Sequence, residues 1–231
     1  MGLFDKMREA GTARELRRQS ELAQQRYQSA LTNWQASQAL GNKMLAALEG
    51  LERGQDAVSS NAVMKKGEYA FWTGQASLHE SRRQAGTYVG RSSGISIPIG
   101  KTGLRYRTGA IKGTFVPGDE VQATLDHGTV LMTTARVIFN GNLKTQEWAF
   151  SKWTGADADE YERNYLFHVS NRQKASGVSF PSDALGQEFN RFLGVVLRIE
   201  RDGIPSLISS LKETLEASVS EKPTPPTEIT N

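Results

Sequence analysis

The stretch that decides the fold covers residues 128–150 and reads GTVLMTTARVIFNGNLKTQEWAF. It contains two short apolar runs, joined at Thr134 and Ala135, and then a polar-to-aromatic segment that ends in Trp-Ala-Phe. Short apolar runs bounded by turn residues are typical of β-strands, whose successive side chains point to opposite faces of a sheet. The stretch therefore predicts consecutive strands connected by tight turns.

The same character extends on both sides of this stretch. Proline, glycine, threonine, valine and isoleucine become frequent from about Glu68. Further strands are expected within residues 68–81, 86–113, 164–171 and 176–181. Because strand follows strand at short spacing with no helix between them, the pattern favours an antiparallel barrel or sandwich.

One segment within this region ends like a phosphate-binding loop. Residues 90–103 read GRSSGISIPIGKTG. A phosphate loop needs four residues between its first glycine and the Gly-Lys-Thr, followed by a helix, but five residues separate Gly94 from Gly100. The β-branched run between them is extended, and the segment after Thr102 alternates like a strand. We therefore expect a glycine-rich hairpin and no nucleotide hydrolysis.

Other catalytic and metal-binding patterns are also missing from the sequence. The chain has no cysteine, which excludes disulfides, thiolate metal sites and a cysteine nucleophile. The three histidines, His79, His127 and His168, lack the spacing of metal ligands. The acidic segment at residues 155–163 is interpreted as a solvated turn. We expect no catalytic residue, no metal, no cofactor and no enzyme activity.

The N-terminal segment is predicted to be helical. Residues 13–54 contain no proline and are rich in helix-forming residues. Residues at 4-3 spacing form a heptad seam through Leu16, Ser20, Ala23, Tyr27, Ala30, Trp34, Ser37, Gly41, Met44, Leu48 and Leu51. The seam fits a helix that self-associates and equally a helix packed on its own domain. A third alternative ends one helix at Gly41 and Asn42 and starts a second, giving a helical hairpin.

The C-terminal part predicts two helices and a tail. A first helix begins after Pro181, capped by Ser182 or Asp183, and buries an apolar stripe. The stripe comprises Leu185, Phe189, Phe192, Leu193, Val196 and Ile199. A second helix follows Gly203, with Leu207, Ile208, Leu211 and Leu215 on one face. The predicted organisation is a helical arm at 1–58, a β domain with its closing helix at 59–200, a C-terminal helix at 201–218 and a disordered tail at 219–231.

The turn at residues 133–136, the apolar strand at 137–141 and the Glu-led strand at 147–150 are followed by the capped helix. In this order they resemble the bacterial pleckstrin-homology-like and GRAM-like domains, over residues 67–200. The resemblance implies an α+β fold: a pleckstrin-homology-like antiparallel β-barrel or sandwich closed by a C-terminal helix. The N-terminal arm, a coiled coil or a hairpin, lies outside it.

Domains of this kind mostly bind lipids or peptides and rarely catalyse. In lipid-binding members, a lysine followed by a spaced Arg-x-Arg grips inositol phosphates, and Lys101 with Arg105 and Arg107 has this form. Arg172 and Lys174 lie in a turn between strands and form a second candidate anion contact. The alternative for both groups is a solvated polar surface. Arg136 is expected to be structural and to close its turn onto a carboxylate or carbonyl, and the four tryptophans are expected to pack in the core.

The favoured function is a non-enzymatic binding or adaptor protein that contacts a protein or an anionic ligand, with the helical arm for self-association. One alternative is a peripheral membrane protein that binds anionic lipid headgroups through Arg105, Arg107 and its N-terminal amphipathic stretch. Another is a structural component of a phage or secretion assembly. The net charge of only +3 argues against a nucleic-acid partner. Because no apolar run approaches a membrane span, we expect a cytoplasmic protein, with or without peripheral membrane contact.

Overall fold

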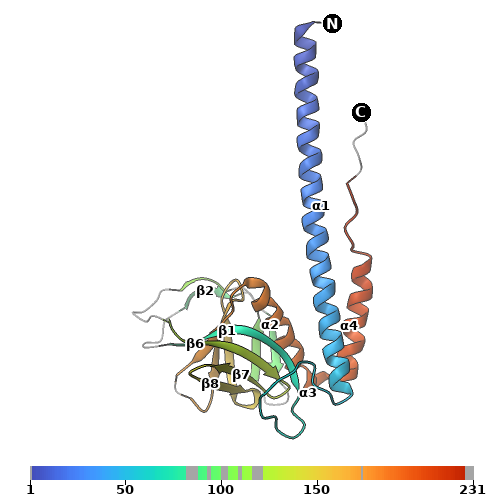
Figure 1. The fold of residues 1–231 in the computed structure, drawn as a ribbon. Coiled ribbons are helices and arrows are strands. Elements are labelled where there is room, and N and C mark those ends of the chain that lie inside the picture. The colour runs from blue at the N-terminus through green and yellow to red at the C-terminus, as the bar shows by residue number, and fades with distance from the viewer. Residues whose placement is uncertain are drawn as a thin grey trace. The chain divides into compact units, whose positions relative to one another are not determined.

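The computed structural model describes residues 2–81, 88–92, 95–99, 104–108, 111–115, 122–172 and 174–226. The chain divides into two compact units. The first, formed by Met1–Leu45 and Ser210–Asn231, is mostly helical where it is described, and the second, Ala46–Ser209, contains the sheet (Figure 1). The structure is therefore of the α+β class, as the sequence predicts.

Seven antiparallel strands form the main sheet, in the order β8-β7-β6-β1-β11-β10-β9. Their bounds are β1 Ala70–Ser81, β6 Gln122–Thr133, β7 Arg136–Gly141, β8 Thr145–Ala149, β9 Trp153–Ala158, β10 Asn164–Val169 and β11 Ser176–Ser179. The first and last strands, β1 and β11, pair in the middle of the sheet. Strands β6, β7 and β8 follow outward from β1, and strands β10 and β9 follow outward from β11. The strands expected from the alternating pattern are thus confirmed.

The sheet curls but does not close into a barrel. β8 and β9 are consecutive in the chain yet lie at opposite ends of the sheet, joined only by the 3-10 turn Phe150–Lys152. A connection this short spans at most about 14 Å, so the two ends lie close together. The ring of Trp148 fills the interior between them, 4.9 Å from that of Phe167, and its Nε1 donates to Ser176 Oγ at 3.1 Å. Side chains rather than backbone pairing fill the opening, so of the predicted barrel or sandwich the structure shows an antiparallel sheet that does not close into a barrel.

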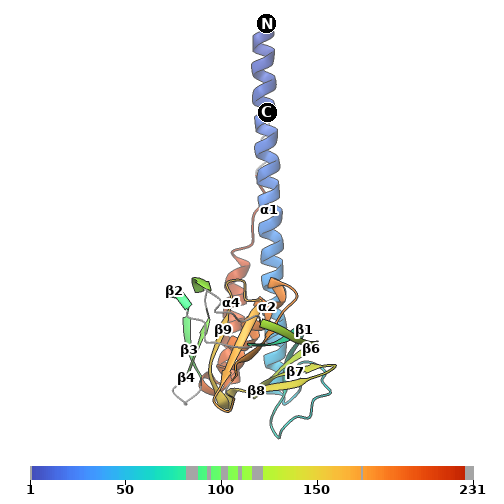
Figure 2. The same cartoon turned by 90° about the vertical axis from the view of Figure 1, so that its left-hand side faces the viewer.

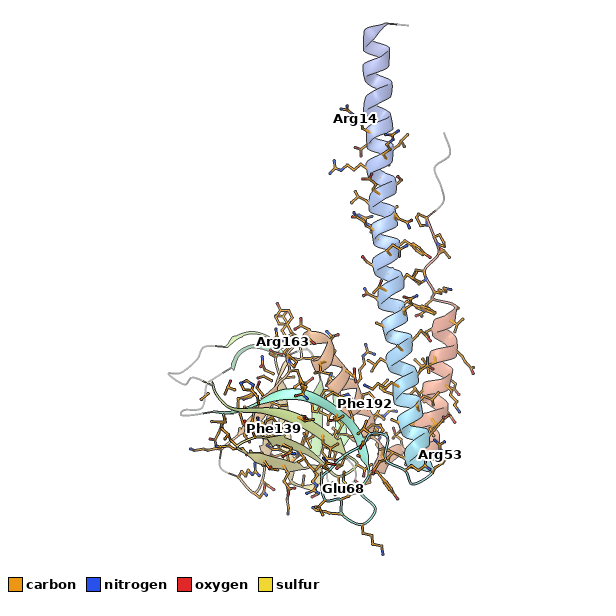
Figure 3. All side chains as sticks on the ribbon, in the orientation of Figure 1. Arg14, Arg53, Glu68, Phe139, Arg163 and Phe192 are labelled. Carbon is orange, nitrogen blue, oxygen red and sulfur yellow. The ribbon has the colours of Figure 1, made fainter. Side chains whose placement is uncertain are left out.

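Helix α2 (Asp183–Val196) follows the last strand and packs against β1. The Ser182 hydroxyl accepts a hydrogen bond from Leu185 N at 3.3 Å, which confirms the predicted cap. The buried face of α2 includes Phe189 and Phe192, and Figure 3 marks Phe192 on the helix. Phe192 meets Phe71 of β1 edge-on, with 5.2 Å between ring centroids. Aromatic burial of this kind holds the helix on the sheet.

The chain between β1 and β6 forms two small antiparallel pairs. β2 (Tyr88–Ser92) pairs with β5 (Ile111–Phe115), and β3 (Ile95–Ile99) pairs with β4 (Leu104–Thr108). β4 also lies beside β9 of the main sheet (Figure 2). Within the segment that resembles a phosphate loop, residues 95–99 form strand β3, and the next described residues, 104–108, form strand β4 rather than a helix, as the sequence predicts.

In the helical unit, α1 (Leu3–Glu52) runs through Gly41 without a break, so the helical hairpin is wrong. Helix α4 (Ile204–Val219) lies alongside α1 within this unit (Figure 1). A Cβ at position 41 would lie 2.5 Å from Leu215 Cδ2, so glycine permits the close approach of the two helices. About one helical turn after Leu215 on α4, Ser218 O accepts a hydrogen bond from Trp34 Nε1 at 2.8 Å. The seam from Trp34 to Gly41 is thus packed within the chain.

Closer to the N-terminus, the seam is more open. Leu16 is 37% exposed and Leu22 43% exposed, and Figure 3 shows the Arg14 side chain on this part of the helix. Beyond the end of α4, Lys222 Nζ lies 5.7 Å from the centroid of the Trp34 ring. Residues 227–231 of the predicted tail lie outside the described part of the chain.

Candidate functional site

Two of the predicted anion-binding residues lie in the turn between β10 and β11. Arg172 and Lys174 are both exposed there. Arg105 and Arg107 lie in β4, opposite Pro98 and Ser96 of β3. A single residue separates them along the strand. Their side chains, and all of Lys101, lie outside the described part of the chain. The structure therefore places one predicted pair at the surface and the other on a strand beside β9.

A contact at the start of the β10–β11 turn brings a further lysine to its neighbourhood. Ser170 N donates to Lys152 O at 2.8 Å, which fixes Lys152 beside the start of the turn. The Lys152 side chain is exposed. It is a single lysine beside a strand, so the sequence offered no signal for it.

These three cations, Lys152, Arg172 and Lys174, are called the basic turn cluster. Within the residues that the structure describes, none of them forms an ion pair. Exposed cations without a carboxylate partner attract anions, because their charge is not neutralised by a direct contact. The cluster can hold a phosphate or a carboxylate by charge-assisted hydrogen bonds.

A pair formed by a histidine and an aspartate lies on the strands next to this cluster. His168 Nε2 lies 2.8 Å from Asp157 Oδ2, between β10 and β9. The hydrogen bond with Asp157 raises the pKa of His168, although partial burial opposes it. The side chains are 41% and 45% exposed, so solvent screens the interaction. This pair therefore adds a charge that changes with pH on the strands next to the basic turn cluster.

Arg136 is held by a network at the turn between β6 and β7. Its Nε donates to Glu68 Oε1 at 2.8 Å, its Nη2 donates to Val63 O at 2.8 Å, and its Nη1 donates to Glu147. Burial tends to raise the pKa of Glu68, but hydrogen bonds from Arg136, from the Thr133 hydroxyl and from the backbone N–H of Lys65 outweigh it and lower that pKa. The prediction that Arg136 closes its turn onto a carboxylate and a carbonyl is confirmed.

A groove of about 500 Å³ lies on the outer face of the sheet. The segment between α1 and β1 forms one wall, and strands β1, β6, β7 and β8 supply the rest. Leu131 and Ile138 line it, together with the polar residues Ser59, Ser60, Asn61, Thr73, Thr129, Asn140, Thr145 and Glu147. A volume of this size is typical of ligand-binding sites. The sequence did not indicate it, because its residues come from two separate stretches of the chain, 59–73 and 129–147.

The tryptophans pack as expected. Trp72, Trp148 and Trp153 are fully buried, and Trp34 is half-buried on the seam. Among the residues described, no group of three or more His, Asp or Glu side chains is arranged to hold a metal ion. The helices in the described part of the chain are too short or too polar to cross a membrane.

Comparisons of the chain with known protein families, with curated proteins and with solved structures gave no match. The chemistry of the site is therefore argued from its own residues.

Proposed function

We propose that this chain is a non-enzymatic binding protein of the adaptor type, with a pleckstrin-homology-like β unit that holds an anionic ligand. The strand order supports the fold assignment. A curled antiparallel sheet whose first strand pairs with its last, followed by a helix on the first strand, is the arrangement that such a domain requires. The ends of the sheet are joined by a short turn rather than by pairing, which suits an open barrel of this kind.

The observation that carries the proposed activity is the basic turn cluster, with its three exposed cations that lack ion-pair partners among the described residues. Strand β4, which contributes Arg105 and Arg107, lies beside β9, whose first residue pairs with Val169 next to the same turn. A phosphate-bearing ligand at the turn would gain about 1 kcal/mol for each cation near it. The ligand is a phosphate group, free in solution or in a lipid headgroup.

Binding to vesicles tests this proposal and separates the two sources of phosphate. Vesicles of phosphatidylcholine alone, vesicles that also contain phosphatidylserine, and soluble inositol hexakisphosphate are compared at low and moderate salt. We expect salt-sensitive binding to at least one anionic probe and none to phosphatidylcholine. Binding to vesicles only identifies a headgroup at a surface, and binding to the soluble compound only identifies a free phosphate ligand.

A pair of matched charge reversals locates the site. Arg172→Glu with Lys174→Glu should weaken binding by about tenfold or more. Lys65→Glu with Lys66→Glu changes the charge equally at two exposed residues that precede Glu68 and are outside the basic turn cluster, and should leave binding almost unchanged. Equal losses in the two double variants, or no binding to any anionic probe, would refute the proposed site.

Self-association through α1 is a second component of the proposal, and the exposed Leu16 and Leu22 favour it. The seam beyond Trp34 has no contact with α4 that would satisfy these residues in the described part of the chain. A second copy would cover Leu16, Ala23 and Tyr27 by knobs-into-holes packing. Sedimentation velocity tests this: Leu16→Asp with Tyr27→Asp should shift an oligomer to monomer, whereas a wild-type chain that is monomeric at all concentrations would contradict it.

A further inference from the structure

Strand β8 is an edge of the main sheet, with one side of its backbone unpaired in the described chain. Phe150 N donates to Ala135 O, and Gly141 N donates to Lys144 O, both at 2.9 Å. These bonds set the phase of the ladder with β7, because antiparallel residues alternate between hydrogen-bonded and non-hydrogen-bonded pairs. In the register of β7 and β8, Arg136 lies opposite Ala149.

The phase determines which backbone groups of β8 remain open. Gln146 and Trp148 direct their N–H and C=O groups toward β7, and Thr145, Glu147 and Ala149 direct theirs away from it. No described residue pairs with the outward groups. Thr145 and Glu147 are exposed. An edge with unpaired donors and acceptors is a template for another extended segment.

The side chains that accompany this edge face the groove. Alternation along β8 places Gln146 and Trp148 inside the curled sheet, where both contact Ser176, and places Thr145 and Glu147 on the outer face. The edge and the groove are therefore continuous. A segment paired with β8 would project every second side chain over the groove.

Two carboxylates share one guanidinium on this face of the sheet. Among the described residues that line the groove, Arg136 is the one cation, and it contacts both Glu68 and Glu147. The Glu68 side chain is only 2% exposed and holds the guanidinium through both of its oxygens. The Glu147 side chain is 49% exposed, so its charge reaches solvent at the rim of the groove. Lys144, exposed in the turn before β8, does not line the groove. The Glu147 carboxylate can therefore attract a further cation at this rim.

We propose that the β8 edge binds an extended peptide segment that carries a lysine or arginine opposite Glu147. The peptide backbone pairs with Thr145, Glu147 and Ala149, and its basic side chain meets the Glu147 carboxylate. Residues two positions on either side of the basic residue lie over the groove, where Leu131 and Ile138 offer an apolar contact. The mode is strand addition at a sheet edge, and it goes beyond the anionic ligand proposed above.

The same geometry disfavours a second copy of this strand as the occupant. Two β8 strands paired antiparallel about Glu147 would set their carboxylates opposite each other. Like charges directly opposite destabilise a strand pair. A basic peptide is attracted by the Glu147 carboxylate, whereas a second β8 strand is repelled by it. The charge of Glu147 therefore favours a peptide of opposite sign.

Fluorescence anisotropy with a labelled peptide tests the proposal on the 231-residue chain. The probe is acetyl-Thr-Val-Thr-Lys-Thr-Val-Thr-amide, compared with versions that carry norleucine or glutamate in place of the lysine. A fourth version is N-methylated at alternate amides, which removes the donors for strand pairing. We expect the lysine peptide to bind tightest and the N-methylated peptide not to bind.

Matched variants of the protein assign the contact. Glu147→Gln should weaken the lysine peptide by about threefold to fivefold, the range for a partly exposed ion pair. Glu160→Gln, at an exposed carboxylate in another turn, should change nothing. Far-UV circular dichroism checks that both variants are folded. Peptides that bind equally well whatever their central residue, or an unchanged affinity in Glu147→Gln, would overturn the charge contact.

Amide hydrogen exchange supplies an independent readout of strand addition. The amides of Thr145, Glu147 and Ala149 should become protected at saturating lysine peptide, whereas those of Gln146 and Trp148 are protected already. Unchanged exchange at the three outward amides would overturn strand addition even if the peptide binds. Neither readout depends on Arg172 and Lys174, so failure here is distinct from failure of the anionic site.

Discussion

Arg136 Nε donates to Glu68 Oε1 across 2.8 Å, although 68 positions of sequence separate the two residues. The Glu68 side chain is 2% exposed and that of Arg136 is 10% exposed. Thr133 Oγ1 donates to the same Glu68 oxygen at 2.7 Å. The network ties the chain before β1 to the turn between β6 and β7, and it also supports one wall of the groove.

Glu68→Gln should therefore destabilise the protein by about 3 kcal/mol, because it leaves the buried guanidinium without its main compensating charge. Arg163→Gln is the matched control. The Arg163 and Asp183 side chains are 45% and 52% exposed, with 3.5 Å between their charged atoms, so this change should cost less than about 1 kcal/mol. Urea unfolding measures both, and similar losses in the two variants would contradict the structural role of Glu68.

His79 should make the protein sensitive to acid. It is 3% exposed, and neither ring nitrogen makes a well-formed hydrogen bond to a described residue, although the backbone of Val178 and Tyr165 partly opposes the effect of burial on its pKa. Burial lowers its pKa below 6.5, so on acidification the unfolded chain takes up a proton before the folded chain does, and stability falls as the pH drops below 6.5. His79→Leu should reduce this loss, measured by urea unfolding above and below that pH.

The control for His79 is His127→Leu, which changes an exposed histidine whose Nδ1 lies 2.8 Å from the Ser77 hydroxyl. An acid sensitivity that is unchanged in His79→Leu, or lowered equally by the control, would show that burial of His79 is not its source.

The pair of His168 and Asp157 should act in the opposite direction. Because the hydrogen bond with Asp157 raises the pKa of His168 above 6.5, its stabilisation is complete below that pH and is lost as the pH rises through the folded-state pKa. With both side chains more than a third exposed, the effect should stay below about 1 kcal/mol. NMR titration of the imidazole should show the His168 midpoint fall in Asp157→Asn, and an unmoved midpoint would refute the assignment.

Gly41→Leu should destabilise the helical unit by about 1 to 3 kcal/mol through overpacking, since even a Cβ at this position would lie 2.5 Å from Leu215 Cδ2. The same change at Gly11 meets nothing within 4 Å. There it should stabilise the helix by up to about 1 kcal/mol, because leucine has the higher helix propensity. Thermal unfolding followed at the helical dichroism band distinguishes the two, and stabilisation by both would contradict the close approach of α4.

Much of the fold was predictable because its signals are local. The apolar runs around Thr134 and Ala135, the cap at Ser182 and the stripe containing Phe189 each lie within one element and report its type. Closure of the sheet was not predictable. It depends on whether β8 reaches β9, which is decided by Trp148 and Ser176, residues from different strands. Gly41 was ambiguous for a related reason: the same residue suits a helix end and a close helix contact.

The candidate sites were harder to predict than the fold. Arg172 and Lys174 were found because they lie close together in one turn, but Lys152 joins them only through the folded backbone. The sequence analysis placed Glu147 only at the start of a strand. Its role at the groove depends on Arg136, which donates to Glu68 as well as to Glu147, and Glu68 is far away in sequence. Spacing along the chain carries no information on such a division.

The three-residue link between β8 and β9 has a mechanical consequence. A curled sheet with one unpaired joint yields first at that joint, because separation there breaks side-chain packing but no ladder of backbone hydrogen bonds. The covalent link limits how far the two edges can part. Thermal fluctuations of the sheet should therefore appear as a small, hinge-limited widening between these two strands, with Trp148 as the residue whose surroundings change most.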